Sequence, residues 1–516
     1  MRPITRSKAT TQKFLQYTQG MLVRMGALRS FLAALYRRLV RILLIVAGLA
    51  LFVGIELQLA NAINAAMFIN IFIIISIVIA MMLIIVSPTW GFIFWLFFSP
   101  FAKYFIRTFL PIRIGFDMLL LGLLVTAILF RALAHRTRLP KLILPEWLLI
   151  ASFVYSMVLR NASAIATPAY LSQIILTPLV VYFVAKSAIV KKEHIGWILL
   201  AMLLVGLSWT LLGIYEQQSG HSWLSPLVGF DVQAQGESMG SGHRSLGPAG
   251  HYYLYGNAII LAILITMHRA GWTRKITSKV LHYSLLPILL LGLYYGYSRA
   301  PYLAFAFALL LMLLLVRLSF KRYFVFTAAI VVVVTILLSV WVSDKVLEGR
   351  LESSSSSRLA FNATSMNMFK AHPVFGIGLR RYQESVPDYV SSIKHLHRGS
   401  AFGVATYWSR PHNEYLLVLA EQGIVGFLLY FGCYITFIIT AFRVRSKLDK
   451  AGVFGAEFAA LVIAFVFGVL LTMITDEFQN WLYMYAIIFV LFAAVVRLGE
   501  MAAANKLIVN VDSNDV

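Results

Sequence analysis

The chain alternates between long apolar blocks and shorter polar connections. Apolar runs such as 69–86 and 323–342 are long enough to cross the hydrocarbon core of a membrane as helices. Backbone groups in lipid need partners within their own segment, so we predict an all-α, polytopic bundle of about 12–14 transmembrane spans. The expected spans begin near Leu39, Ala66, Thr89, Ile112, Pro145, Tyr170, Ile195, His251, Val280, Pro301, Tyr323, Asn413, Phe454 and Trp481.

The polar segments divide the chain into five parts. Residues 1–38 form a basic N-terminal segment whose apolar positions recur at helical spacing, which predicts a helix on the inner membrane surface. Residues 39–342 form the main transmembrane bundle, and residues 413–498 form the C-terminal spans. Between them, residues 343–412 form the longest hydrophilic interruption, which we expect to be a large loop outside the membrane with short amphipathic helices; the resemblance described below implies that this side is the periplasm. Residues 499–516 form a tail.

Charge orients these parts. Hydrophobic residues make up 60% of the chain and charged residues 13%, whereas about 25% is typical of a soluble domain. The net charge of +23 resides largely in alternate connections, which the positive-inside rule assigns to the cytoplasm: 131–141, 186–192, 269–279, 317–322, 443–450 and the N-terminal segment. Both termini are then cytoplasmic. These cations flank spans and do not share one face, which argues against a nucleic-acid partner and favours membrane lipids.

Few residues suit metal or redox chemistry. Cys433 is the only cysteine and falls within an apolar span, which excludes an intrachain disulfide. The eleven histidines are scattered, without the spacings typical of metal ligands. We therefore predict no metal and no cofactor.

Cations also gather in the long loop on the predicted outer side. Serines before Arg358 can cap a helix that ends near His372-Pro373 and lies on the outer membrane surface. Arg381 and Arg410 follow, and the cationic excess of this loop favours an anionic ligand such as a phosphate or pyrophosphate. A tight corner between two earlier spans carries a further outer arginine, Arg299.

His412 stands at the beginning of an apolar helix. A neutral imidazole at a membrane boundary can accept a proton from a sugar hydroxyl, or it can simply bond the backbone or a lipid at a helix start. The residues alone leave both interpretations open. The pair Asp476-Glu477 lies at another outer corner, where a second acid–base site is the weaker interpretation.

Several segments together resemble the family of bacterial O-antigen ligases and O-antigen or exopolysaccharide polymerases. The resemblance covers roughly residues 297–430 and rests on Ser298-Arg299, the long-loop Arg358, Ala371-His372-Pro373-Val374-Phe375-Gly376-Ile377-Gly378, His412-Asn413-Glu414-Tyr415 and Glu421-Gln422-Gly423-Ile424-Val425-Gly426. It implies a metal-independent membrane glycosyltransferase. Such an enzyme takes a glycan from an undecaprenyl-pyrophosphate carrier and joins it to an acceptor sugar hydroxyl on the periplasmic face.

The resemblance also implies roles for particular residues. Arg299 and Arg358 match arginines expected to grip the pyrophosphate, and His412 matches the histidine proposed as general base. Arg244 resembles an arginine of the preceding outer loop, although the segment from Pro248 to Tyr252 departs from the common form. The other predicted substrate-binding residues are Arg381, Arg410 and Asn413.

The acceptor and the reaction type stay open at this stage. The acceptor is either the lipid A core or a protein, which would make this chain a ligase, or a growing polysaccharide, which would make it a polymerase. A transporter or flippase of lipid-linked glycans is the third alternative. It is disfavoured because the charges concentrate on one outer loop and not along a path through the bundle.

Overall fold

The protein is described by a computed structural model that divides into two compact units, Met1–Met82 and Leu83–Val516. The described residues are 79, 81–84, 87–106, 116–134, 142–158, 168–219, 245–316 (except 250 and 274), 351–389, 410–449, 452–478 and 482–514. The basic N-terminal segment and the spans expected near Leu39 and Tyr323 lie outside them, as does most of the span expected near Ala66.

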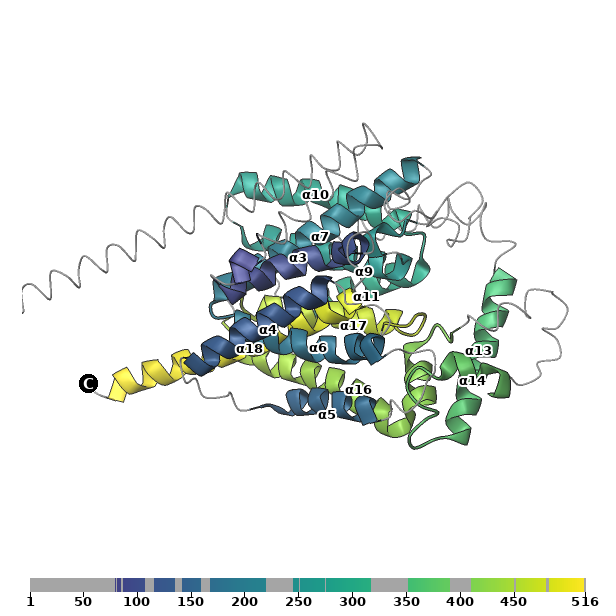
Figure 1. The fold of residues 1–516 in the computed structure, drawn as a ribbon. Helices are drawn as coiled ribbons and strands as arrows, with labels where there is room; N and C mark the ends of the chain where they lie inside the picture. The colour runs from purple at the N-terminus through teal and green to yellow at the C-terminus, as the bar shows by residue number, and fades with distance from the viewer. Residues whose placement is uncertain are drawn as a thin grey trace, which may run out of the picture. The chain divides into compact units, whose positions relative to one another are not determined.

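Every regular element in the described part is helical, which confirms the predicted all-α polytopic membrane protein (Figure 1). Five helices are long and apolar enough to cross a membrane, and shorter apolar helices accompany them. The α-helices are α3 (Pro88–Ile106), α4 (Phe116–Ala134), α5 (Leu144–Val158), α6 (Pro168–Ala188), α7 (Lys192–Ser219), α9 (Tyr252–Trp272), α10 (Ile276–Tyr295), α11 (Arg299–Leu315), α13 (Leu351–Ala371), α14 (Tyr382–Tyr389), α16 (Glu414–Lys447), α17 (Ala456–Thr472) and α18 (Leu482–Asn514). A short 3₁₀ helix, η2, spans Gly247–Ala249.

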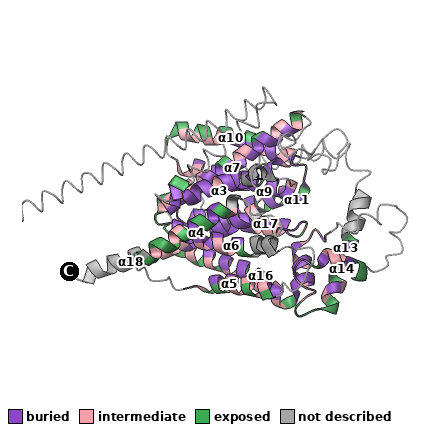
Figure 2. Ribbon diagram, in the orientation of Figure 1, coloured by how far each residue is buried: buried purple, intermediate pink, exposed green. Residues whose placement is uncertain are grey.

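The helix α9 is the most deeply buried of the spanning helices and packs against α7, α10 and α17. Its sequence is apolar on all sides, as expected for a helix surrounded by other helices. In contrast, α10 exposes Ile276, Val280 and Leu281, and Figure 2 shows the exposed residues of α10 at the edge of the bundle. Apolar side chains on that outer surface are suited to contact with lipid tails.

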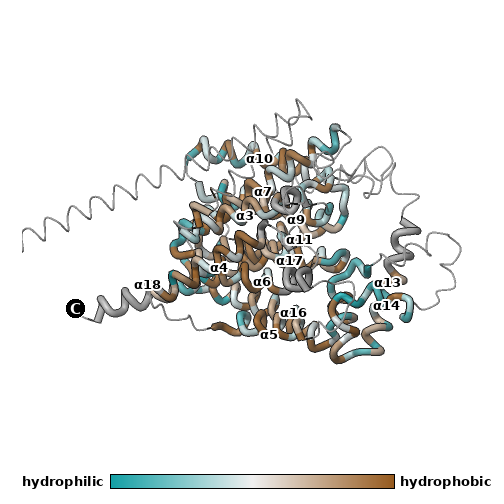
Figure 3. Tube along the Cα trace, in the orientation of Figure 1, coloured by the Kyte–Doolittle hydropathy of each residue, from teal (hydrophilic) through white to brown (hydrophobic). Residues whose placement is uncertain are grey.

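A polar layer formed by α13, α14 and their connection lies at one end of the bundle, where Figure 3 shows hydrophilic residues gathered. The helix α13 ends at Ala371, immediately before His372-Pro373, as the sequence predicts. The layer is joined to α16 by a small core that consists of Met368, Tyr382, Val386, Leu417 and Ala420. The first two turns of α16 therefore belong to this layer.

The helix α16 is broken at Gly423, whose φ of 64° and ψ of −168° are non-helical. The connection after α13 fills the break. Ile377 N–H donates to the Ala420 carbonyl at 3.0 Å and Gly378 N–H to the Glu421 carbonyl at 2.9 Å. In return, Ile424 N–H donates to the Pro373 carbonyl at 2.8 Å. Backbone groups that the break would leave without partners are thus paired with the loop.

The fit between loop and break depends on glycine at both positions. A Cβ on Gly423 would lie 2.3 Å from the Val374 carbonyl oxygen, and a Cβ on Gly376 would lie 2.4 Å from the Glu421 carbonyl carbon. Both glycines also have positive φ. The two glycine-containing motifs of the sequence are therefore complementary halves of one structural joint.

A buried polar cluster lies at the predicted inner ends of α5, α6 and α18. Glu146 of α5 pairs with Lys186 of α6 at 2.5 Å and accepts a hydrogen bond from the Tyr182 hydroxyl at 2.6 Å. Lys186 also pairs with Glu500 of α18 at 2.8 Å. These contacts connect three helices, and α18 continues beyond Glu500 to Asn514.

Candidate active site

His412 lies directly before α16, at the end of the bundle that carries the polar layer. Its φ is 47°, in the left-handed region that non-glycine residues rarely adopt. Its side chain is 43% exposed. The next residue, Asn413, caps the helix, since its side-chain oxygen accepts a hydrogen bond from Leu416 N–H at 3.1 Å. The backbone thus turns sharply at His412 and leaves the imidazole accessible to solvent.

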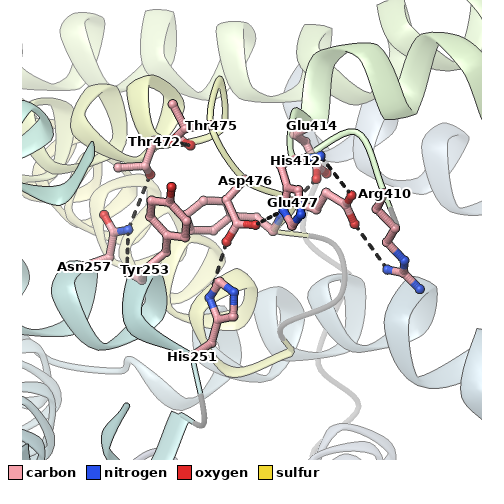
Figure 4. A network of polar contacts seen from close by, with 11 residues as sticks. His251, Tyr253, Asn257, Arg410, His412, Glu414, Thr472, Thr475, Asp476 and Glu477 are labelled. Carbon is pink, nitrogen blue, oxygen red and sulfur yellow. Dashed lines mark hydrogen bonds and ion pairs between the residues drawn. The ribbon is translucent and has the colours of Figure 1, made fainter. Parts of the chain in front are cut away.

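Asp476, in the turn after α17, faces His412 (Figure 4). Its Oδ1 lies 3.5 Å from His412 Nδ1, and its Oδ2 lies 3.4 Å from Nδ1 of His251, the residue before α9. The carboxylate side chain is 5% exposed, whereas the His251 side chain is 19% exposed. One buried carboxylate therefore bridges two histidines from different parts of the chain.

Glu477 connects the same turn to the segment before α16. One of its carboxylate oxygens accepts a hydrogen bond from the Arg410 guanidinium at 3.2 Å, and the other accepts one from the backbone N–H of His412 at 3.4 Å. Burial raises the pKa of Glu477 above its ordinary value, while the positive charge of Arg410 opposes that rise. The two contacts hold His412 and Arg410 against the turn.

Glu414 fixes the turn from the other side. It is fully buried and accepts hydrogen bonds from Phe478 N–H at 2.8 Å and from the Tyr430 hydroxyl at 2.9 Å. Its own backbone N–H donates to the Met473 carbonyl at 2.8 Å. Since these bonds flank Asp476 on both sides, the carboxylate that faces His412 is held by buried, directional contacts.

The remaining predicted residues are distributed as follows. Arg299 is the first residue of α11 and is exposed, and Arg381 is also exposed, between α13 and α14. Arg358 lies within α13, but its side chain and all of Arg244 fall outside the described residues. The structure therefore brings together Arg410, His412 and Asn413. The roles assigned to all seven residues stay predictions.

Asp476, Glu477 and His251 are absent from the predicted site, yet they surround His412. The available signals were an adjacent acidic pair at an outer helix end and a histidine where the sequence departs from the common family form. Neither signal indicates which other residues these side chains contact in the folded protein. Among the described residues, no group of His, Cys, Asp and Glu is arranged to hold a metal ion.

The fold and the site define a polytopic helical membrane protein with a histidine–carboxylate cluster where several helices begin or end. Residues 284–431 match the family model described as O-Antigen ligase. The resemblance drawn from the sequence is thereby confirmed, and this part of the chain carries an O-antigen ligase domain. The match supports a ligase- or polymerase-type function acting on lipid-linked glycans. It includes Arg299, Arg358 and His412 but neither His251 nor Asp476. A search of curated proteins finds no match.

Proposed function

We propose that the protein transfers a glycan from an undecaprenyl-pyrophosphate carrier to an acceptor sugar hydroxyl, with His412 as general base. The observation that carries this proposal is the solvent-accessible imidazole of His412 with Asp476 at its Nδ1. A carboxylate accepts hydrogen bonds, so it favours the tautomer with hydrogen on Nδ1. The Nε2 lone pair is then free to accept a proton.

The proposed reaction needs only the two substrates and residues of this chain. The acceptor oxygen forms a bond to the anomeric carbon while the bond from that carbon to the phosphate oxygen breaks. The electron pair of the broken bond leaves on the pyrophosphate, and the hydroxyl proton passes to His412. Arg299 and Arg358 are the residues proposed to stabilise the charge on the pyrophosphate. Guanidinium groups can supply this charge stabilisation, so the proposal includes no metal ion.

The exposed Arg299 supports this assignment, because it lies at the N-terminus of α11. Backbone N–H groups and the helix dipole favour anions at such an end. The site lies at the beginnings of α9, α11 and α16, which loop charge predicts to be outer ends, and this supports a reaction on the periplasmic face of the inner membrane. The acidic and histidine side chains of the site lie mostly at helix ends. A flippase would need charged groups along a path through the bundle, so this arrangement favours a transferase.

Purified variants test the residue roles. We expect His412→Ala and Arg299→Ala to lose at least about a hundredfold in transfer rate from a lipid-pyrophosphate glycan, as is typical when a general base or a charge-stabilising donor is removed. His194→Ala and Arg443→Ala at the predicted inner ends are matched controls that retain activity. Full activity in His412→Ala or Arg299→Ala would remove the role assigned to that residue.

Ligase and polymerase share this chemistry and differ in the acceptor. Deletion of the gene, followed by gel analysis of the cell's polysaccharide, separates the two. Long free chains with none attached to lipid A core indicate a ligase, whereas single repeat units indicate a polymerase. An unchanged polysaccharide pattern would contradict both.

A further inference from the structure

His251 has no role in the reaction described above, yet it contacts the carboxylate that faces the proposed base. Its Nδ1 lies 3.4 Å from Asp476 Oδ2, on the side of the carboxylate opposite to His412. The imidazole also stacks on Tyr252, with ring centroids 4.8 Å apart and an interplanar angle of 18°. His251 is thus held in place by its neighbour in the chain.

We propose that His251 is a positioning residue that acts on His412 through the shared carboxylate of Asp476. This inference rests on the proposed function, because it concerns the same base. His251 Nδ1, which lies 3.4 Å from Oδ2 of Asp476, fixes that oxygen and thereby aims Oδ1 at Nδ1 of His412. An imidazole at this distance also takes up part of the carboxylate's negative charge, which weakens the attraction between Asp476 and a protonated His412.

The surroundings of Asp476 make this assistance necessary. Its side chain is 5% exposed, so solvent contributes little to holding the carboxylate. The other charged groups near His412 in the described structure are Glu477 from the same turn and Arg410 and Glu414 from its own segment. Glu477 is engaged with Arg410 and with the backbone N–H of His412, and Glu414 is engaged with Phe478 and Tyr430. His251 is therefore the side chain that contacts Asp476 on the oxygen facing away from His412.

The chain just before His251 is bonded to α7. The Glu216 carboxylate accepts hydrogen bonds from Leu246 and Gly247 N–H at 3.0 and 3.1 Å, which anchors η2 to α7. His251 itself belongs to the first turn of α9, since its carbonyl accepts a hydrogen bond from Tyr255 N–H at 3.1 Å. The position of the histidine relative to Asp476 is therefore set by the buried helix α9.

Four variants test the proposal. His251→Phe removes the donor and keeps an aromatic ring for Tyr252, whereas His251→Asn keeps an N–H donor. Asp476→Asn removes the charge, and the fourth variant combines His251→Phe with Asp476→Asn. We expect kcat to fall roughly tenfold in His251→Phe, a fraction of the contribution of a general base, with KM little changed. His251→Asn should restore most of that loss.

The acidic limb of the pH–activity profile distinguishes positioning from a merely structural role. Without His251 the whole carboxylate charge acts on His412, so the limb should move to higher pH in His251→Phe. Without the carboxylate it should move to lower pH in Asp476→Asn. In the double variant the effect of His251→Phe should disappear, since its path runs through Asp476. An unchanged rate and profile in His251→Phe, or the same fold-loss in both backgrounds, would overturn the proposal.

A second measurement does not depend on glycan transfer. Diethyl pyrocarbonate modifies unprotonated imidazoles, and the modification of the exposed His412 is followed by mass spectrometry as a function of pH. The pH midpoint of His412 modification should move to higher pH in His251→Phe and to lower pH in Asp476→Asn, as the acidic limb of the activity profile does. If the wild-type protein transfers no glycan while these shifts occur, the proposed function fails and the link from His251 to His412 stands. If transfer is normal and no midpoint moves, only the link fails.

Discussion

The joint between α16 and the loop after α13 predicts that Gly423→Ala destabilises the protein strongly. Gly423 has φ 64° and ψ −168°, a region that only glycine adopts readily. An added Cβ would lie 2.3 Å from the Val374 carbonyl oxygen and 2.6 Å from the Gly376 nitrogen, both of which belong to backbone. Neither the conformation nor the contact can be relieved by rotation of a side chain.

The expected magnitude follows from two contributions. Holding alanine in this backbone region costs about 1–3 kcal/mol. To relieve the clash the loop must retreat, which loosens the hydrogen bonds from Ile424 N–H to the Pro373 carbonyl and from Val425 N–H to the Val374 carbonyl. Each such bond contributes about 1 kcal/mol. The total destabilisation is about 3–5 kcal/mol, which lowers the unfolding midpoint of a chain of this size by at least about 3 °C.

Thermal unfolding of the detergent-solubilised protein, followed by circular dichroism and tryptophan fluorescence, measures this loss. Gly432→Ala is the matched control on the same helix. A Cβ at Gly432 meets only Leu148 Cδ1, at an ordinary 3.9 Å, and alanine is a better helix former than glycine. We expect the control to unfold at the wild-type temperature or slightly above it. Equal midpoints for Gly423→Ala and Gly432→Ala would refute the account of the joint.

Three further predictions concern charge. Because burial raises the pKa of Glu477, the folded protein binds the proton of that carboxyl more tightly than the unfolded chain does, and wild-type stability falls as pH rises from about 4.5 toward the raised pKa. The thermal unfolding midpoint of Glu477→Gln should therefore rise relative to that of the wild type across this pH window. Parallel curves of unfolding midpoint against pH for the two proteins, from pH 4 to about pH 8, would contradict this. Glu146→Gln should destabilise the protein by about 1–3 kcal/mol and lower its unfolding midpoint, because it removes the buried partner of Lys186 and leaves that cation paired with Glu500. The folded fraction should keep its specific activity, and a midpoint equal to wild type would contradict the destabilisation. Incubation with EDTA should leave glycan transfer unchanged, and a loss that Mg²⁺ or Mn²⁺ restores would show a metal requirement.

Much of the fold was predictable because lipid imposes a simple rule on the backbone. Apolar runs long enough to span a membrane must be helices, so the spans near Ile195, His251 and Asn413 appear where the sequence predicts them. The end of α13 was predictable for a local reason, since Pro373 disfavours helical backbone in the residue before it. Both inferences need only neighbouring residues.

The break in α16 required information that a local pattern does not hold. Gly423 stands in a sequence that reads as one continuous helix, and glycine alone is tolerated within helices. The break is stable because a loop some fifty residues earlier supplies donors and acceptors of matching geometry, as in the contact between Ile424 and Pro373. The same limit applies to the site: the sequence indicates His412 through family resemblance, whereas Asp476 and His251 are brought to it only by the packing of α9, α16 and α17.

The break separates the segment that carries the proposed base, His412, from the rest of α16. The segment from Glu414 to Gln422 packs with α13 and α14 through Leu417 and Ala420, and it is bonded to the turn that carries Asp476 through Glu414. Beyond Gly423 the helix continues as a span. The segment that carries His412 is therefore held by the polar layer and by the turn with Asp476. A variant that straightens or loosens the break should then lose transfer activity in excess of its loss of folded protein, because the proposed base and Asp476 would no longer be held by the same set of contacts.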